Sequence, residues 1–147
     1  MWVAVIDSHT HLFLCEAGEV ELVAAAEAAG VGRMLNVGLD AETNATVIAQ
    51  AERHEALYAS VGRHPNDATG FGDAAAAELL ALGAHEKVRA IGETGLDFYR
   101  DTAPPDEQRR AFAAQIEVAG ELGLPIVIHA RDPEGSTEAV DEIFATL

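Results

Sequence analysis

Short runs of apolar, often β-branched residues alternate along this chain with longer, alanine-rich segments whose apolar residues recur at helical spacing. The short runs predict buried strands at residues 2–6, 34–37, 57–61, 88–91 and 125–128. The longer segments predict helices at residues 20–29, 43–53, 73–82 and 105–122, and a last helix that Ser136 or Thr137 caps and that runs to the end. The pattern therefore predicts five strand–helix units in succession.

Strands that alternate with helices form parallel sheets with right-handed crossovers. Two architectures fit this order, a doubly wound open sheet and a (β/α)8 barrel. An open sheet usually carries a glycine-rich first turn, but the segment 7–11, Asp-Ser-His-Thr-His, contains no glycine, so the barrel is favoured. Each unit averages about 29 residues, and eight such units need roughly 235. We therefore expect residues 1–147 to form a partial α/β barrel of the TIM type, with about five units present and the C-terminal three absent.

The composition is typical of a folded cytoplasmic domain. Hydrophobic residues make up 49% of the 147 residues, which excludes intrinsic disorder. No apolar run approaches the ~20 residues that a membrane span needs, and the start of the chain lacks a signal-peptide pattern, so we expect no membrane partner. The single cysteine, Cys15, excludes an intrachain disulfide and fits a reducing compartment. We expect Cys15 to be a small buried residue.

The charge restricts how the chain could hold a nucleic acid. Acidic residues number 25 and basic residues 9, giving a formal net charge of −16, and Lys87 is the only lysine. Because duplex binding rests on Lys and Arg side chains that neutralise phosphates, this composition excludes a general DNA-coating protein. A nucleic-acid substrate would have to be held by bound metal and a few local arginines.

Chemically active side chains follow four of the five predicted strands. The first strand is followed by Asp7, His9 and His11, the third by His64, the fourth by Glu93 and Asp97, and the fifth by His129 and Arg131. Only the second strand, with Asn36, Gly38 and Asp40 at its end, offers no obvious ligand. The carboxyl ends of the strands in a parallel barrel converge on one mouth, so we expect these groups to face one another.

The residue types and their spacing favour a metal site. Residues two apart on a strand project to the same face, so His9 and His11 can reach one metal ion. Glu93 has two oxygens and can bridge two cations about 3.5–4 Å apart. His129 ends an apolar strand, where an imidazole is costly unless it is bonded or ligating. The alternatives are a hydrogen-bonded histidine pair at a barrel rim and a Glu93 that pairs with Arg131.

The roles of the other strand-end residues stay open. His64 fits a pocket residue, a contact to a substrate phosphate or a brace for its own loop. Arg131 either clamps an anionic substrate or orients Glu93, and Arg63 is a weaker candidate for the clamp. Asp97 is either an acceptor for a ligand histidine or a turn residue.

Four segments of the chain resemble the TatD family of metal-dependent deoxyribonucleases. They are Asp-Ser-His-Thr-His-Leu at 7–12, Val-Gly-Arg-His-Pro at 61–65, Ile-Gly-Glu-Thr-Gly-Leu-Asp-Phe-Tyr at 91–99 and Leu-Pro-Ile-Val-Ile-His-Ala-Arg at 124–131. They occur in the family's order, with a helix of the expected type from Gln108 to Gln115, and the resemblance covers nearly the whole chain. It implies a (β/α)8 barrel of the amidohydrolase type with metal-dependent nuclease activity, often 3′ to 5′ on DNA, and tRNA-related hydrolysis in some members.

The resemblance also implies roles for particular residues. His9 and His11 would bind one divalent ion, His129 the second, and Glu93 would bridge both. The ions are not identified among Zn, Mn, Mg, Fe, Co and Ni, although imidazole with carboxylate suits Mg least. Glu93, His64 and Arg131 would be the catalytic residues, and His64, Arg131 and Arg63 would bind the substrate, most simply single-stranded DNA. The reaction implied is attack on phosphorus by a metal-activated water.

The family pattern continues with two segments that the printed sequence does not contain. One is a His-x-Phe-Ser-Gly-like segment whose histidine would complete the second metal site, and the other is a Glu-Thr-Asp segment whose aspartate would complete the first. We therefore expect the 147-residue chain alone to be weakly active or inactive. We also expect the first and fifth strands to be open edges through which the chain can self-associate.

Two other functions fit parts of the sequence. One is another amidohydrolase-type barrel that acts on an amide or ester, since a His-x-His start is shared, although the segment 92–97 favours the nuclease family. The other is a non-catalytic, acidic chain that binds metal or pairs with another chain through its exposed edges. A comparison of phosphodiester with amide substrates separates the first from a nuclease, and a measurement of size in solution tests the second.

Overall fold

A computed structural model describes residues 5–100 and 102–147. The strands are β1 (Val5–Thr10), β2 (Val31–Val37), β3 (Leu57–Val61), β4 (Val88–Asp97) and β5 (Ile126–Arg131). The helices are α1 (Glu19–Ala28), α2 (Ala41–Arg53), α3 (Asp73–Gly83), α4 (Pro105–Leu122) and α5 (Glu138–Thr146), with short 3-10 helices η1 (Leu12–Leu14) and η2 (Pro65–Asp67). Within those described ranges, no helix combines the length and the apolar content that crossing a membrane would require.

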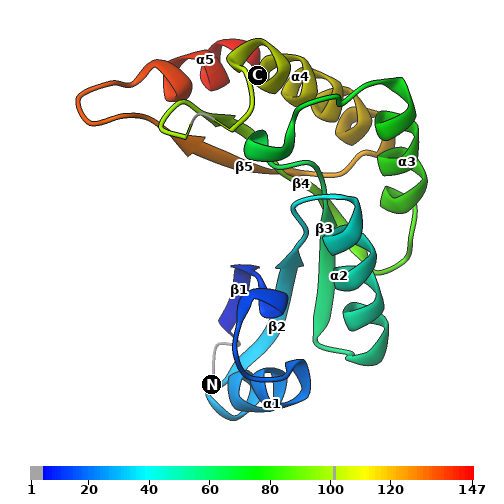
Figure 1. Cartoon of the computed structure of the whole chain (residues 1–147). Coiled ribbons are helices and arrows are strands. Elements are labelled where there is room, and N and C mark those ends of the chain that lie inside the picture. Colours follow the sequence, from blue (N-terminus) through cyan, green and yellow to red (C-terminus); the bar gives the residue numbers. More distant parts are fainter. Residues whose placement is uncertain (1–4, 101) are drawn as a thin grey trace.

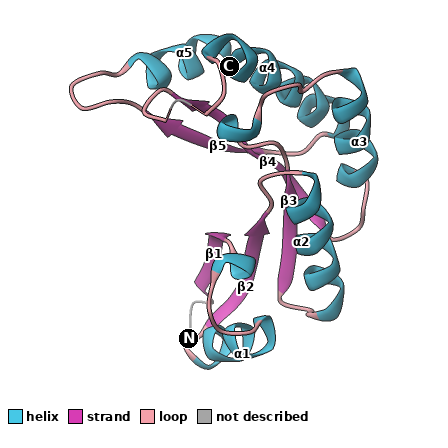
Figure 2. Cartoon of the chain, viewed as in Figure 1, coloured by secondary structure: helices cyan, strands magenta, loops and turns pink. Residues whose placement is uncertain are grey.

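The order of the strands decides between the two predicted architectures. The five described strands pair in parallel in the order β1-β2-β3-β4-β5, the same as their order along the chain. A doubly wound sheet reverses its strand order at a switch point, whereas a barrel wall does not. The sheet curves and its helices lie on the outer, convex side (Figures 1 and 2). The chain therefore forms about half of a (β/α)8 barrel, as the sequence predicts.

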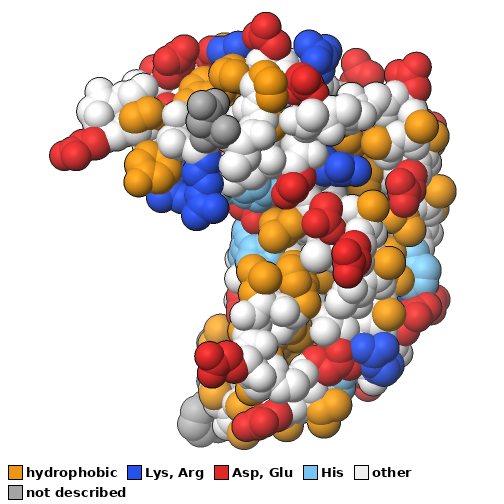
Figure 3. Space-filling view, in the orientation of Figure 1, with side chains coloured by type: hydrophobic (Ala, Val, Ile, Leu, Met, Phe, Trp, Pro, Cys, Tyr) orange, Lys and Arg blue, Asp and Glu red, His pale blue; other side chains and the backbone are white. Residues whose placement is uncertain are grey.

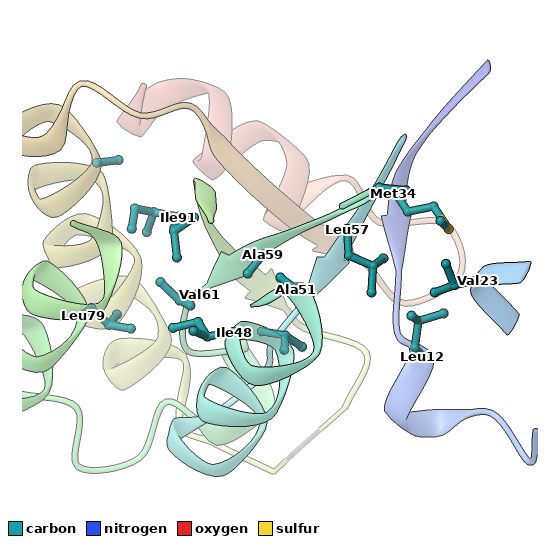
Figure 4. Close-up of a cluster of buried hydrophobic side chains, with 14 of the residues drawn as sticks. Leu12, Val23, Met34, Ile48, Ala51, Leu57, Ala59, Val61, Leu79 and Ile91 are labelled. Carbon is teal, nitrogen blue, oxygen red and sulfur yellow. The ribbon is translucent and has the colours of Figure 1, made fainter. Parts of the chain in front are cut away.

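The core lies between the sheet and the outer helices. Leu57, Ala59 and Val61 alternate along β3 toward α2, where they pack with Ala51, and toward Ile91 of β4 (Figure 4). All five side chains are buried, because every second residue of a strand points to the same face. The residues between them on β3 face the concave side, which would be the interior of a closed barrel.

Three strands extend beyond their predicted ends. The predicted ends at residues 6, 91 and 128 are wrong, because β1 continues to Thr10, β4 to Asp97 and β5 to Arg131. The apolar pattern stops early because the last residues of these strands are polar and form the candidate site. Residues 2–4 of the first predicted strand lie outside the described part. β2 begins at Val31, before the predicted residue 34, while the bounds of β3 and α4 agree with the prediction.

Two glycines shape the end of β4, where the pairing with β5 is irregular between Ile91 and Thr94. Gly92 and Gly95 have φ angles of +141° and +139°, which side chains other than glycine rarely adopt. A Cβ at Gly95 would lie 2.1 Å from the carbonyl oxygen of His129. Only glycine therefore lets β4 approach β5 this closely on either side of Glu93.

Two smaller expectations from the sequence need correction. Cys15 is exposed, since it lies in the loop after η1 and not in the core. Thr137 occupies the N-cap position of α5 but makes no side-chain cap hydrogen bond, whereas Oγ of Ser136, the other predicted cap, accepts the N–H of Glu138 at 3.2 Å. The carboxylate of Asp132, which the sequence did not indicate, accepts the N–H groups of Ala139 and Val140 at 2.8 and 3.2 Å.

Candidate metal centre

The end of β1 forms the first group of candidate ligands. The Nε2 atoms of His9 and His11 lie 3.1 Å apart, and they lie 3.3 and 3.4 Å from Oε2 of Glu93. His11 donates Nδ1–H to the carbonyl of Val37 at 2.7 Å, so that in neutral His11 the Nε2 lone pair faces Glu93. His9 near the end of β1 and His11 just beyond it thus meet a carboxylate three strands away.

The second group gathers around the other oxygen of Glu93. Nδ1 of His129 lies 2.9 Å from Oε1 of Glu93 and 3.1 Å from Nε2 of His64. Nε2 of His64 lies 3.9 Å from the same Oε1. Each oxygen of Glu93 therefore faces one pair of histidines, which is the arrangement that a bridging carboxylate requires.

The spacing of the first group fits a divalent ion. Three ligand atoms at about 2.0–2.1 Å from a tetrahedral zinc ion lie about 3.3 Å from one another, and the observed separations are 3.1, 3.3 and 3.4 Å. Three acceptor atoms, one of them on an ionised carboxylate, would repel at such distances unless a proton or a cation lies between them. The donor set of imidazole and carboxylate suits Zn, Mn, Fe, Co or Ni. The roles of His9, His11, Glu93 and His129 as ligands stay predictions that this geometry fits.

The cluster alters the protonation of its members. Burial alone would raise the pKa of Glu93, but hydrogen bonds with His11 and His129 hold it well below its usual range. The hydrogen bond with Glu93 raises the pKa of His11. The pKa of His129 is also raised, because contacts with Glu93 and Asp97 outweigh the effect of burial. Burial, together with the neighbouring His129, lowers the pKa of His64 to about 4.

Asp97 has both of the roles that the sequence left open. Its Oδ2 accepts a hydrogen bond from Nε2 of His129 at 3.1 Å, which leaves Nδ1 of His129 toward Glu93. Its Oδ1 accepts the backbone N–H groups of Tyr99 and Arg100 at 3.1 and 2.9 Å. One buried carboxylate thus orients a candidate ligand and fixes the turn that follows β4.

Buried amide side chains from the outer helices hold the strand ends, and sequence reasoning missed their role. Gln108 accepts the N–H of Asp97 and donates to its carbonyl, at 2.8 and 3.1 Å. Gln115 pairs with the N–H and carbonyl of Arg63 at 2.7 and 3.1 Å. Asn44 makes the same pair of hydrogen bonds with Gly62 at 3.0 and 2.9 Å. The available signal was an amide residue at a helix position whose side chain faces the protein core.

The remaining sequence candidates lie at the mouth of the site. His64 lines the cavity and also braces its loop, because its Nδ1 accepts the N–H of Asn66 at 3.1 Å. Arg131 makes no ion pair with Glu93 in the described part of the chain, so that alternative is wrong. Its guanidinium stacks on Tyr99 instead. Arg63 donates to the carbonyl of Asp67 and does not line the mouth.

The cavity at this mouth measures about 320 Å³ and is lined by His64, His129, Arg100 and Arg131 among others. Figure 3 shows histidine side chains at the hollow of the molecule with arginine or lysine side chains near them. A larger cavity of about 370 Å³ lies toward the other end of the concave face and is lined mainly by apolar atoms. Of these two cavities, candidate ligands line the smaller one, so we place the chemistry there.

Three positively charged side chains lie around the ring of Tyr58, which lines the larger cavity. The guanidinium carbons of Arg33 and Arg89 lie 5.6 and 4.8 Å from the ring centroid, and Nζ of Lys87 lies 5.2 Å from it. No ion pair with a carboxylate involves these three cations in the described residues. Three of the nine basic residues therefore gather at one point on the concave face.

A curved wall of parallel strands that carries a histidine–carboxylate cluster at the carboxyl ends of its strands defines a β/α-barrel protein with a candidate dinuclear metal centre. Comparison with known proteins makes the class more specific. The model of the family described as TatD related DNase matches residues 6–146, and the chain belongs to this family. The resemblance inferred from the four sequence motifs is thereby confirmed.

Individual relatives agree with this assignment. The chain is 45% identical over 112 residues to the 3′-5′ ssDNA/RNA exonuclease TatD of Cronobacter sakazakii, covering 76% of this chain and 43% of that protein. It is 41% identical over 138 residues to the metal-dependent hydrolase TatD of Mycobacterium tuberculosis, covering 88% and 52%. The crystal structure of the TatD homolog YJJV from Escherichia coli superposes with a TM-score of 0.82 at 28% identity, covering 99% and 57%. The chain thus spans about half the length of the curated relatives it matches.

Proposed function

We propose that this chain carries the metal-binding half of a phosphodiesterase that removes nucleotides from the 3′ end of single-stranded DNA or RNA. The observation that carries the proposal is the position of Glu93, which directs one oxygen to His9 and His11 and the other to His64 and His129. The name of the Cronobacter sakazakii relative, 3′-5′ ssDNA/RNA exonuclease TatD, supports this choice of substrate.

The residues present fit two divalent ions. His9, His11 and Oε2 of Glu93 would hold one, and His129 with Oε1 of Glu93 would contribute to holding the other. Bound divalent ions would polarise the phosphodiester and lower the pKa of water, so that hydroxide is available near neutral pH. Glu93 stays ionised for this purpose, because its pKa is held well below its usual range.

His64 is better suited to donate a hydrogen bond than to bind metal. Its pKa of about 4 keeps it neutral near pH 7. Because Nδ1 accepts the N–H of Asn66, the single proton of neutral His64 is on Nε2, the atom that faces the site. His64 would therefore donate Nε2–H to a phosphate oxygen, while Arg131 supplies positive charge at the same mouth and Arg63 supplies it from the loop after β3.

The ligand assignment can be tested without activity. The purified chain should bind two Mn²⁺ ions, and Glu93→Gln should weaken both, because one bridging carboxylate serves both positions. His85→Ala is the matched control, since His85 lies on the surface and contacts Glu52. Calorimetric titration measures the number of ions and their affinities. Unchanged binding in Glu93→Gln would contradict the assignment.

The activity is tested with a 5′-labelled single strand of DNA and added Mn²⁺. We expect stepwise shortening from the 3′ end, inhibition by a chelator, and loss of shortening in the double variant His9→Ala with Glu93→Ala. Shortening that survives the double variant would refute the residue assignment. Hydrolysis of amides or esters in preference to phosphodiesters would refute the proposed substrate class.

We further propose that this 147-residue chain turns over weakly by itself. The His9 side chain is 39% exposed in the open half-barrel, so water weakens the electrostatic contacts that His9 makes. The comparison to make is with the full-length Cronobacter relative under the same conditions. Equal turnover by the two proteins would contradict this expectation. The single cysteine supports a reducing, cytoplasmic location for the protein.

A further inference from the structure

Tyr99 is an aromatic residue that the packing of the described residues does not explain. Its side chain is 57% exposed, while the neighbouring Phe98 packs into the cluster around Leu96 and Phe112. Tyr99 belongs to none of the hydrophobic clusters formed by residues 5–100 and 102–147. An exposed ring beside the candidate site, with no part in the core, therefore needs a different reason.

Arg131 covers one face of this ring. Its guanidinium carbon lies 4.1 Å from the ring centroid, the closest of the cation–π contacts in the described residues. The pairing is a consequence of strand register, because Asp97 of β4 lies opposite Arg131 of β5 and Phe98 donates its N–H to the carbonyl of Arg131 at 2.8 Å. A ring that is stacked on one face and more than half exposed offers its other face to a planar ligand.

The ring is held in a fixed relation to the candidate metal centre. The same Asp97 carboxylate accepts the N–H groups of Tyr99 and Arg100 with one oxygen and contacts His129 with the other. Arg100 and Arg131 both line the cavity that contains His64 and His129. Tyr99, Arg100 and the candidate ligand His129 therefore share one anchor.

The geometry points to a nucleobase-binding platform made by Tyr99 and Arg131, on which one base of a single-stranded substrate stacks while its phosphate enters the metal centre. This inference rests on the proposed function and adds the part of the substrate that is recognised. Stacking tolerates any base because every base has a π-face. It also suits a chain with a net charge of −16, since stacking does not depend on the neutralisation of phosphates.

Two single strands of DNA test the platform with the full chain and Mn²⁺. One is oligothymidylate, and the other is the same strand whose 3′-terminal nucleotide lacks its base; both carry phosphorothioate linkages that slow hydrolysis. Fluorescence anisotropy measures Kd for each. We expect the wild-type chain to bind the complete strand about tenfold more tightly than the abasic one. In Tyr99→Ala this ratio should fall to about one, because no ring remains for the base to stack on.

Two further variants separate stacking from structural roles. Tyr99→Phe keeps the ring and should keep the tenfold ratio. Phe144→Ala removes another exposed aromatic side chain, 74% exposed on α5, and should leave both Kd values at the wild-type level. If Tyr99 only braces Arg131, Tyr99→Ala would weaken both strands equally, and this result would overturn the platform. An unchanged ratio in Tyr99→Ala would overturn it as well.

Failure of the platform and failure of the proposed function give different results. Metal-dependent release of the terminal nucleotide from unmodified strands reports the phosphodiesterase alone. A wild-type chain that releases nucleotides but binds both strands equally refutes the platform and leaves the proposed function standing. A wild-type chain that binds neither Mn²⁺ nor either strand refutes both.

Discussion

Two imidazoles of the candidate metal centre hold a proton more tightly than free histidine does. The pKa values of His11 and His129 are raised above the usual 6.5, through hydrogen bonds with Glu93 and, for His129, against the effect of burial. Protons therefore compete with metal ions below and somewhat above that pH. We expect the stabilisation of the chain by Mn²⁺ to increase as the pH rises from about 6 to about 8.

The rise in melting temperature on addition of Mn²⁺, measured across this range, checks the expectation. Glu93→Gln is the control, because without the ionised carboxylate the metal-induced rise should be small at every pH. A rise that is larger at pH 6 than at pH 8 would show that these histidines are not ligands.

Asp97 allows a more selective test of the same centre. In Asp97→Asn one oxygen can still accept the N–H groups of Tyr99 and Arg100, but the amide nitrogen cannot accept the N–H of His129. We expect about 10–100-fold weaker Mn²⁺ binding, measured by competition with a chelating dye. Asp132→Asn, in the loop between β5 and α5, should bind metal like the wild type. Equal affinity in the two variants would mean that Asp97 serves only the turn.

The outer helices position the strand ends through single amide side chains. Gln115 of α4 satisfies both the N–H and the carbonyl of Arg63 and is fully buried. Gln115→Met keeps the length of the side chain but leaves these backbone groups without partners. We expect a loss of about 2 kcal/mol or more in the free energy of unfolding, measured by urea denaturation. The exposed neighbour Glu117, changed to Met, should lie within about 0.5 kcal/mol of the wild type.

The sequence predicts these elements to different extents. β3 and α4 have their predicted bounds because breakers flank them: Gly62 follows β3, and Pro105 and Gly123 bound α4. β4 extends six residues beyond its predicted end, since the rule that identifies a buried strand by its apolar run stops at the first polar residue. In this fold those polar residues include Glu93 and Asp97 of the candidate site.

The candidate site, too, could be predicted from the sequence only in part. The meeting of His9, His11, Glu93 and His129 could be predicted, because the ends of parallel strands converge whatever the details of packing. The stacking of Arg131 on Tyr99 and the amide pairs could not, since they depend on side-chain directions that only tertiary contacts fix. The bend that two glycines allow around Glu93 is of the same kind.

The whole molecule exposes surface that most single domains bury. β1 and β5 are the edges of the described sheet, and Val5 and Ile6 of β1 are 56% and 65% exposed. Unpaired strand edges with apolar side chains favour association. We expect the chain to form dimers or larger species as its concentration rises, and Ile6→Lys to shift it toward the monomer. Light scattering after size separation measures this, with Val20→Lys on α1 as the control; identical behaviour of both variants would exclude the β1 edge.

The cationic side chains on the concave face make the charge distribution of the molecule uneven. Arg33, Lys87 and Arg89 surround Tyr58, and Arg100 and Arg131 line the mouth. On the outer helices, by contrast, Arg53 and Arg109 are paired with Glu19 and Glu142. The concave face therefore carries local positive charge at these two places, on a chain whose net charge is −16. A polyanion that approaches from the convex side is repelled, whereas one that approaches the hollow meets the opposite sign, so the electrostatic dipole orients the encounter before any contact forms.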